Sequence, residues 1–414
     1  MVGTISWYRY AKTIDSGGIL KEFEHKAKIL GATINNFNKE IVKTEIGKFL
    51  ENKGLLVDGS PTYEILDTEY FKFIADDLIR ENNVTPLLHC QVCDAIMDEN
   101  TIIGVISESK AGRKAILAKR VIDATGDADI VYYSGAPYKK ANKTNLMPVT
   151  TNFGVSGVNI EKFLSFLLKK IQKNPKFLPY LRLSGEIFYL DDFTCFLEPI
   201  NRLNSEESIP LAIPVKKIWN HYQDLGIINS FNGIHIGKTD CTNIIDLTNA
   251  EIEGRKRVIK VIAALRKKIP GFERARLKNI STSLGTRESR KIIGQYNITE
   301  HEVKNQAKFE DSIGICPEFL DAYGFVIMPT TGRYFQIPYG IMVPIKVENL
   351  LVAGRCVAGD KISHAATRQM VCCIVTGQAA GIAAATSIKE QISCRDVNIA
   401  NVQEALKNQG VRIE

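Results

Sequence analysis

The sequence predicts an α/β protein in which one domain is interrupted by an inserted segment of mixed α/β structure. Two apolar stretches far apart in the chain, Arg120–Asp127 and Asn349–Gly354, each have the pattern of a short buried strand that ends in a glycine turn. A long helix rich in alanine and glycine follows the second stretch, around Arg368–Gly381. A strand–turn–helix arrangement is typical of α/β folds, and the distance between the two strands indicates an insertion.

A helix and a β-meander are predicted before the first of these strands. From Asp67, the expected N-cap, to about Asn82, apolar residues recur at helical spacing. Four short apolar stretches follow at 85–90, 93–97, 102–107 and 114–118, with turn signals at 98–100 and 110–112. They indicate one strand leading into a meander.

The inserted segment contains two predicted helices. One covers about 161–172, and the other runs from Ala250 to Lys268. Thr248 and Glu251 have the spacing of a capping box for the second helix, and Pro270-Gly271 is expected to end it. Apolar stretches such as 341–345 then resume the earlier pattern. We therefore expect a first domain part at 1–147, an inserted substrate or cap domain at 148–330, a second part at 331–390 and a helical tail at 391–414.

The composition is that of a globular protein. The 414 residues are 45% hydrophobic and 24% charged, and the net charge of +7 does not by itself indicate nucleic acid. Ten basic side chains between Arg255 and Lys278 face a single acidic one, Glu273. This run is interpreted as a solvated helix and turn, with docking of an anionic substrate or partner as the alternative.

Two features bear on location. The nine cysteines are scattered without regular spacing and Met1 is not followed by a secretory leader, so free thiols in the cytoplasm are expected. Residues 369–388 carry no charge, and Gly377 and Gly381 form a G-x-x-x-G pattern. Because polar residues and alanines make this stretch only weakly apolar, a core helix packed closely through the two glycines is favoured over a membrane span.

The glycine turns are the first chemical signal. Only glycine lets the backbone approach a bulky ligand closely at the end of a strand, where open α/β sheets bind ligands. Ala124-Thr125-Gly126 alone is weak evidence, since it is also compatible with a simple turn. Leu351–Asp360 repeats the arrangement and strengthens it.

Three stretches together resemble a known family: Gly104–Asp127; Gly285–Arg290 with Gly294 and Thr299-Glu300; and Asn349–Gly381. They are similar to FAD-dependent oxidoreductases with a glutathione-reductase-type flavin domain, specifically the heterodisulfide reductase A-like flavoproteins. The resemblance covers the chain from about Gly17 to the tail. It implies an FAD/NAD(P)-binding Rossmann-like domain with a β-meander, an inserted substrate domain and FAD as cofactor. It also implies hydride transfer between flavin and a small substrate, with an anion as one open alternative.

The resemblance also implies which residues contact FAD. Val92 matches the position whose backbone contacts the adenine, and the turn of Ala124, Thr125, Gly126 and Asp127 lies beside the nucleotide. The further cofactor-binding residues fall on the turn along the ribityl and pyrophosphate and on the helix start facing the isoalloxazine: Gly354, Arg355, Asp360, Arg368, Gln369, Met370 and Val371. A helix N-terminus favours negative charge, which suits a reduced flavin ring.

Four residues are candidates for catalysis. The resemblance places Arg287, Glu288 and Arg290 where the inserted domain returns to the flavin, and His364 just before the helix that faces the ring. An arginine here clamps a substrate carboxylate, Glu288 holds an arginine or relays a proton, and His364 acts as acid or base. The alternatives are a structural ion pair for the first three and an ordinary hydrogen-bonded loop histidine for His364.

The chain departs from the family at its start, because no G-x-G-x-x-G occurs in it and Met1-Val-Gly-Thr resembles a later part of the family's sequence. We expect an N-terminal βαβ unit to be missing. Either Met1 is internal to a longer protein, which we favour, or the gene is truncated or split and a complementing N-terminal chain is a partner. In the second case the chain is a subunit without independent FAD binding.

The resemblance also raises iron–sulfur chemistry, because heterodisulfide reductase A-like relatives bind 4Fe-4S clusters. Cys90 and Cys93 point to opposite faces of a strand, and Cys372 and Cys373 diverge on a helix, so we expect no metal site in this chain. An iron–sulfur-linked electron-transfer subunit stays a second alternative. The expected partners are a small-molecule substrate and an electron-transfer protein, with no nucleic acid and no membrane.

Overall fold

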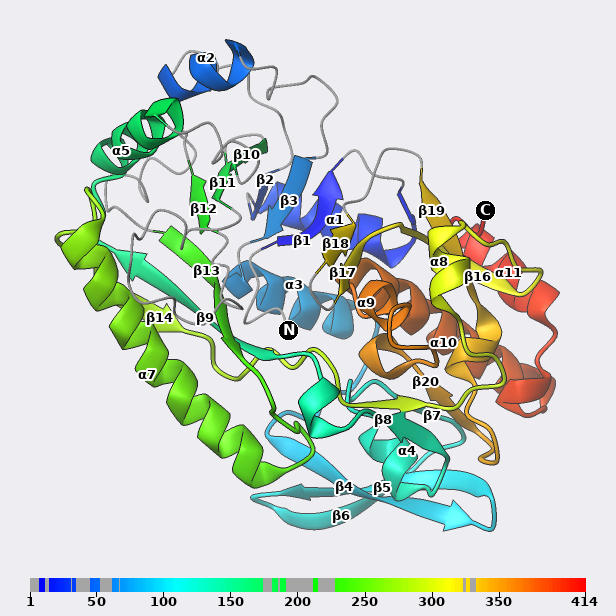
Figure 1. Cartoon of the computed structure of the whole chain (residues 1–414). Helices are drawn as coiled ribbons and strands as arrows, with labels where there is room; N and C mark the ends of the chain where they lie inside the picture. Colours follow the sequence, from blue (N-terminus) through cyan, green and yellow to red (C-terminus); the bar gives the residue numbers. More distant parts are fainter. Residues whose placement is uncertain are drawn as a thin grey trace. The chain divides into compact units, whose positions relative to one another are not determined.

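The computed structural model describes residues 7–11, 15–30, 32–34, 45–52, 62–66, 68–173, 181–184, 187–190, 211–214, 228–322, 325–327 and 333–414 (Figure 1). The chain divides into two compact units. Unit 1 comprises Met1–Ala11, Leu30–Lys72 and Lys143–Thr286, and unit 2 comprises Lys12–Ile29, Phe73–Asn142 and Arg287–Glu414. The domain boundaries predicted from the sequence stay a prediction.

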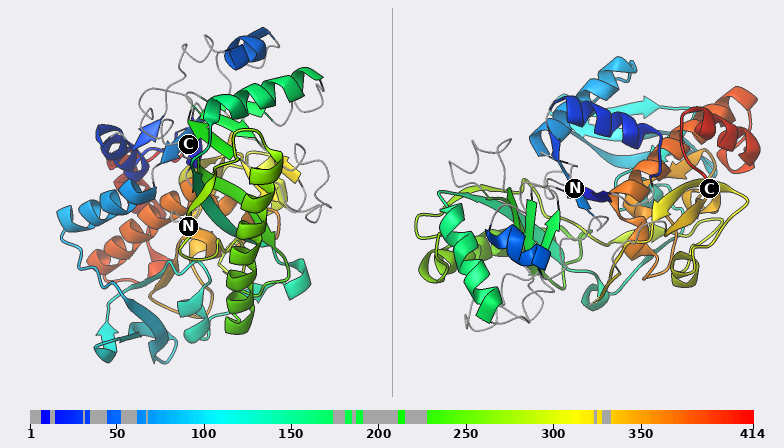
Figure 2. Two further views of the ribbon diagram at one scale, coloured as in Figure 1. Left: turned by 90° about the vertical axis from the view of Figure 1, so that its left-hand side faces the viewer. Right: turned by 90° about the horizontal axis from the view of Figure 1, so that it is seen from above.

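Unit 2 contains α/β structure around one long helix (Figure 2). Its elements are α1 (Ile19–Ile29), most of α3 (Thr68–Glu81), β4 (Cys90–Asp98), β5 (Thr101–Ser109), β6 (Gly112–Leu117), β7 (Val121–Asp123), α4 (Asp129–Tyr133), β8 (Tyr138–Lys140), β15 (Arg290–Ile292), α8 (Glu300–Lys304), β16 (Ser312–Pro317), β17 (Leu320–Ala322), β18 (Phe325–Ile327), β19 (Tyr334–Pro338), β20 (Leu350–Val352), α9 (His364–Thr367), α10 (Met370–Glu390) and α11 (Ile399–Asn408).

The predicted β-meander is present. β4, β5 and β6 form an antiparallel sheet, and Glu99 at φ 52° and Gly112 at φ 86° make its two turns. The strand expected at 85–90 was wrong, because residues 84–88 have no regular structure and only Cys90 enters β4. Leu87 and Leu88 are 60% and 71% exposed, so the apolar run there does not mark a buried strand.

The two predicted strand-and-glycine turns lie side by side. β7 and β20 pair in parallel, with Leu351 opposite Ile122, although their positions differ by more than two hundred residues. α10 packs on β16 and β20 in the same core, and Val375, Ala379 and Ala383 are buried there. Both strand-and-glycine turns therefore belong to unit 2.

α10 is long and apolar enough to cross a membrane, but 56% of the relevant window is buried inside the protein, as in the core helix of a globular fold. The close packing expected at Gly377 and Gly381 was wrong. Both glycines are exposed, and a Cβ added to either would meet nothing within 4 Å. The alanines on the opposite side of α10 make the core contacts instead.

Unit 1 is built on an antiparallel sheet whose strand order is β10-β11-β12-β13-β9-β14. Its described elements are β1 (Trp7–Ala11), β2 (Thr33–Ile34), α2 (Glu45–Asn52), β3 (Thr62–Leu66), β9 (Val149–Ser156), α5 (Ile160–Lys173), β10 (Leu181–Ser184), β11 (Ile187–Leu190), β12 (Leu211–Pro214), β13 (Ile228–Ile236), α7 (Ile244–Lys268) and β14 (Arg276–Ile280). α7 packs on β9, β13 and β14. Phe153, stacked on Phe231 at 4.6 Å between ring centroids, lies in the core of this unit.

Two further predictions need correction. α7 begins at Ile244 rather than Ala250, and its N-cap is Asn243, whose side chain accepts hydrogen bonds from the backbone N–H groups of Ile245 and Asp246. The Thr248–Glu251 pair is therefore inside the helix and is no capping box. The apolar stretch at 341–345, for which no element type was predicted, starts in a turn of 3₁₀ helix that covers Tyr339–Met342.

Candidate functional site

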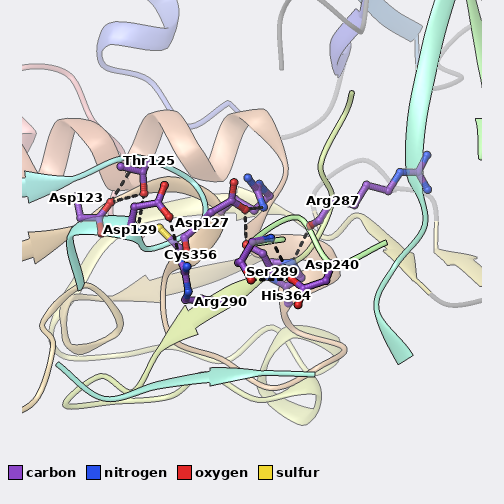
Figure 3. Close-up of polar contacts among 12 residues, drawn as sticks. Asp123, Thr125, Asp127, Asp129, Asp240, Arg287, Ser289, Arg290, Cys356 and His364 are labelled. Atoms are coloured by element: carbon purple, nitrogen blue, oxygen red, sulfur yellow. Dashed lines mark hydrogen bonds and ion pairs between the residues drawn. The ribbon is translucent and has the colours of Figure 1, made fainter. Parts of the chain in front are cut away.

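The ends of β7 and β20 bring two glycine turns together in unit 2. Gly126 has φ 80° and Gly354 has φ 84°, a left-handed conformation that favours glycine. Asp123 at the end of β7 organises the first turn, because its carboxylate accepts from the Thr125 hydroxyl at 2.7 Å (Figure 3). The carboxylate also accepts from the N–H of Val131 at 2.9 Å. Burial raises the pKa of this carboxyl.

Asp127 and Arg355 form an ion pair across the two turns. Arg355 Nη1 donates to Asp127 Oδ1 at 2.7 Å, and the Ser289 hydroxyl donates to the same oxygen. A Cβ added to Gly126 would lie 2.8 Å from Arg355 Nη2. The close approach that glycine permits at position 126 is therefore used by the guanidinium of Arg355.

Arg290 and Glu288 are held in ion pairs. Arg290 Nη1 donates to Asp129 Oδ1 at 2.7 Å and to the carbonyl of Asp127, and its guanidinium lies over the ring of Tyr132. Glu288 accepts from Lys291 Nζ at 3.0 Å, and both side chains are buried. These ion pairs are compatible with the structural alternative raised from the sequence, and the catalytic assignment of the two residues stays a prediction.

Arg287 has a different environment. Its Nη1 lies 4.0 Å from Asp321 Oδ2, and the same carboxylate oxygen accepts from Arg368 Nη2 at 2.7 Å. The main-chain carbonyl of Arg287 lies 3.0 Å from Nε2 of His364. Arg287, Asp321 and Arg368 thus meet through their side chains, and His364 joins them through the main chain of Arg287. We call these four residues the Arg–His cluster (Arg287, Asp321, His364 and Arg368).

The Arg–His cluster contains two unpartnered buried nitrogens. His364 is 1% exposed and Arg368 is 6% exposed, yet His364 Nδ1 and Arg368 Nε have no hydrogen-bond partner in the described structure. Burial lowers the pKa of Arg287 to about 10, and burial together with Lys291 and Arg368 holds the pKa of His364 well below its usual value. Buried polar atoms are rarely left unpaired, so these two mark a place for a ligand or water.

The start of α10 lies next to the Arg–His cluster in the sequence. Gln369 is its N-cap in extended conformation and provides no side-chain cap, because its amide donates to the carbonyl of Ala365 instead. Met370 and Val371 form the first turn. The N–H groups there and the helix dipole favour a negatively charged group.

Two of the other expected cofactor contacts have local roles. Asp360 accepts from the N–H groups of Ile362, Ser363 and Glu300, so its carboxylate organises the turn before α9. Val92 lies on β4 opposite Ser107. The structure brings Ala124–Asp127, Gly354 and Arg355 together, whereas Val92 belongs to the meander sheet. The assignment of all these residues to FAD stays a prediction.

Asp321 is the member of the Arg–His cluster that the sequence did not indicate. It lies on β17, far from both arginines along the chain, and no motif surrounds it. Lys291 was also missed, although its position three residues after Glu288 was a usable signal.

No group of three metal-ligating side chains occurs within the described residues. The eight cysteines among them are free, and burial raises the pKa of Cys356, Cys372 and Cys373. An iron–sulfur cluster therefore has no support in this part of the chain.

The residues present fit the flavin ring of FAD better than its nucleotide end. The uncapped start of α10 and the unpartnered nitrogens of His364 and Arg368 suit an anionic or hydrogen-bonding group such as the flavin ring or a substrate beside it. At the nucleotide end, Gly354 is open, since an added Cβ would meet only Cys373 Sγ at 3.9 Å, but the space at Gly126 is filled by Arg355.

Comparison with known proteins gave one family match. The family model described as FAD dependent oxidoreductase matches residues 11–406. A comparison with curated proteins gave no match.

Solved structures show only distant similarity. A geranylgeranyl bacteriochlorophyll reductase-like protein from Thermoplasma acidophilum is 12% identical, with 86% of this chain and 63% of that one covered and a TM-score of 0.42. The p-nitrophenol 4-monooxygenase PnpA from Pseudomonas putida is 12% identical (83% and 59% covered, TM-score 0.38), and L-proline dehydrogenase from P. horikoshii is 13% identical (95% and 82% covered, TM-score 0.36). This chain thus spans less than two thirds of the first two, and similarity at this level carries no argument about activity.

Proposed function

This chain belongs to the FAD dependent oxidoreductase family, and we propose that it acts as an enzyme that transfers hydride between a bound flavin and a small anionic substrate. The substrate class is proposed from the Arg–His cluster, where the buried guanidinium group of Arg368 and the partly buried one of Arg287 lie at the same carboxylate. A heterodisulfide reductase A-like subtype and a cytoplasmic location are part of the proposal.

In this proposal FAD supplies the hydride chemistry, and Gly354, Arg355 and the start of α10 hold it. The protein's own side chains then have two tasks. Arg287 and Arg368 bind the substrate anion, because both guanidinium groups lie at the same carboxylate of Asp321 and can reach a second anionic group beside it. His364 accepts or donates the substrate proton at Nδ1, the nitrogen without a partner in the described structure.

The test begins with the purified chain. We expect a yellow protein that releases about one equivalent of flavin on denaturation, and whose flavin band bleaches anaerobically with one class of anionic donor. Replacing Arg368 by Gln is expected to raise the KM for that donor more than tenfold with unchanged flavin content, since the anion loses one charged hydrogen-bond partner.

The matched control is Lys304→Gln, which removes a cation that pairs with Glu300 on the surface. It should leave KM unchanged. Reduction only by neutral donors, or an unchanged KM in the Arg368→Gln protein, would contradict the anionic substrate.

A second candidate function is a subunit that binds no flavin alone and works with a complementing chain or an electron-transfer partner. Two observations favour it: the parallel sheet of the described part of unit 2 has two strands, and Arg355 fills the space at Gly126. A colourless, folded protein that takes up no added FAD would select this candidate over the enzyme.

A further inference from the structure

One face of α7 carries a feature that the oxidoreductase proposal does not use. The opposite side of the helix packs on the sheet of unit 1, and Ala250, Gly254, Val258, Val261 and Leu265 are buried there. α7 has 25 residues and is therefore about 37 Å long at about 1.5 Å per residue. Figure 2 shows it as one uninterrupted helix.

Three isoleucines lie on the outward side of α7. Ile245 is 65% exposed, and Ile252 and Ile259 are each 57% exposed. They are spaced seven residues apart, which is nearly two full turns, so they form a row along the helix. Single exposed apolar residues are ordinary on protein surfaces, but an aligned row is typical of a binding face.

The same side of α7 is basic. Lys256, Lys260, Arg266 and Lys267 are exposed and fall beside or between the isoleucines at about 100° per residue. Each acidic side chain of the helix has an ion-pair partner: Glu251 pairs with Arg255, Glu253 with Arg257 and Asp246 with Lys143. The outward side therefore combines apolar side chains with more basic than acidic groups, since Glu253 is the acidic residue beside Lys256 and Lys260.

We infer that this α7 face, formed by Ile245, Ile252, Ile259, Lys256, Lys260, Arg266 and Lys267, docks on the surface of an anionic lipid bilayer. A helix that lies in the membrane interface has this composition: apolar side chains enter the acyl boundary, while lysine and arginine reach the headgroup phosphates. A second copy of the chain fits less well, because two such faces would bring like charges together. The sequence predicted no membrane partner, but that prediction depended on α10 as a possible span and not on α7.

The experiment is co-sedimentation of the full chain with vesicles of phosphatidylcholine alone and of phosphatidylcholine mixed with phosphatidylglycerol. We expect binding to the mixed vesicles at low salt, at least tenfold weaker binding to phosphatidylcholine, and loss of binding at high salt. Each lysine close to an anionic membrane surface contributes about 1 kcal/mol, which is about a fivefold change in the partitioning of the protein between water and vesicles. The expected differences in vesicle binding follow from this value.

Two variants separate the contributions. Lys256→Glu with Lys260→Glu is expected to weaken binding to mixed vesicles more than tenfold, and Ile252→Ser with Ile259→Ser at least threefold. All four side chains point away from the core, so circular dichroism and the melting temperature should match the parent. The control, Leu117→Ser with Lys119→Glu, changes an exposed apolar residue and an exposed lysine in unit 2 and should bind like the parent.

Three results would overturn the inference. Equal binding to both vesicle types would show that anionic lipid is not recognised. If the lysine variant lost vesicle binding but the isoleucine variant kept the binding of the parent, the α7 face would be a general polyanion site, such as one for nucleic acid. If the parent protein bound no vesicles and the isoleucine variant sedimented with a different coefficient from the parent, the α7 face would be an interface between copies of the chain.

Discussion

His364 Nε2 lies 3.0 Å from the main-chain carbonyl oxygen of Arg287. A carbonyl only accepts, so the neutral imidazole carries its proton on Nε2, and Nδ1 is left as an unpaired acceptor inside the protein. This contact joins α9 to the residue that opens the last segment of unit 2, and it fixes the tautomer in which Nδ1 is free for a ligand.

The first prediction concerns pH. The pKa of His364 in the folded protein lies well below its value in the unfolded chain, mainly because burial disfavours the charged ring. The unfolded chain therefore binds a proton near pH 6.5 that the folded protein does not, and stability is lost as pH falls below that value, by about 1.4 kcal/mol per pH unit.

Urea unfolding at pH 7.5 and 5.5 measures the loss. His364→Gln is expected to make the free energy of unfolding less dependent on pH over this range. His301→Gln, which replaces an exposed histidine, is the control and should keep the dependence of the parent. Parallel pH profiles for the parent and the His364→Gln protein would show that burial of this ring does not set the dependence.

The second prediction concerns the charge balance of the Arg–His cluster. Asp321→Asn removes the carboxylate that Arg287 and Arg368 share, and it leaves two cations close together. We expect the free energy of unfolding to fall by about 1–3 kcal/mol. This is less than for a fully buried ion pair, because the side chain of Asp321 is 32% exposed. Added sulfate should reduce the difference in stability between the Asp321→Asn protein and the parent, because it supplies an anion in place of the carboxylate. Thermal melts of both proteins with and without sulfate measure this effect. The control is Glu300→Gln, which removes an exposed ion pair with Lys304 and should change the free energy of unfolding by no more than about 0.5 kcal/mol.

The third prediction tests where α7 begins. Asn243→Ala should cost about 1 kcal/mol, because its side chain accepts from two backbone N–H groups of the first turn. Thr248→Ala should cost almost nothing, since the Thr248 hydroxyl donates to the Ile244 carbonyl within the helix and caps no free N–H. Urea unfolding of both variants decides between the two N-caps, and a larger loss for Thr248→Ala would contradict the structure.

The capping error has a physical reason. Thr248 and Glu251 have the right spacing, but Glu251 accepts from the N–H of Leu284, a partner that only the tertiary fold brings close. The β-meander and the two strand-and-glycine turns were predicted correctly because each depends on local turn residues, such as Gly112 and Gly126, and on short apolar runs.

The Arg–His cluster was predictable only in part. Arg287 and His364 were expected as site residues, but Asp321 comes from a separate strand with no local signal. From the sequence, Arg290 and Glu288 were also expected to be catalytic, like Arg287. The roles of such neighbouring residues cannot be distinguished without knowing their contacts. In the structure Arg290 pairs with Asp129, whereas Glu288 pairs with Lys291.

The last prediction concerns the contact between α7 and its sheet. A Cβ added to Gly254 would lie 2.1 Å from Thr151 Oγ1, so Gly254→Ala forces α7 away from β9. Alanine gains about 1 kcal/mol in helix propensity, but the overpacking costs more, and we expect a net loss of about 1–3 kcal/mol.

Thr151→Ala should restore most of that loss in the double variant, because the hydroxyl it removes is buried and unpartnered. Alone, Thr151→Ala should be nearly neutral. Gly377→Ala in α10 is the matched control: nothing lies within 4 Å of its added Cβ, so it should stabilise by up to about 1 kcal/mol. A double-mutant cycle in urea measures the coupling between positions 254 and 151, and additive effects would mean that the sheet and α7 do not approach as closely as the structure has them.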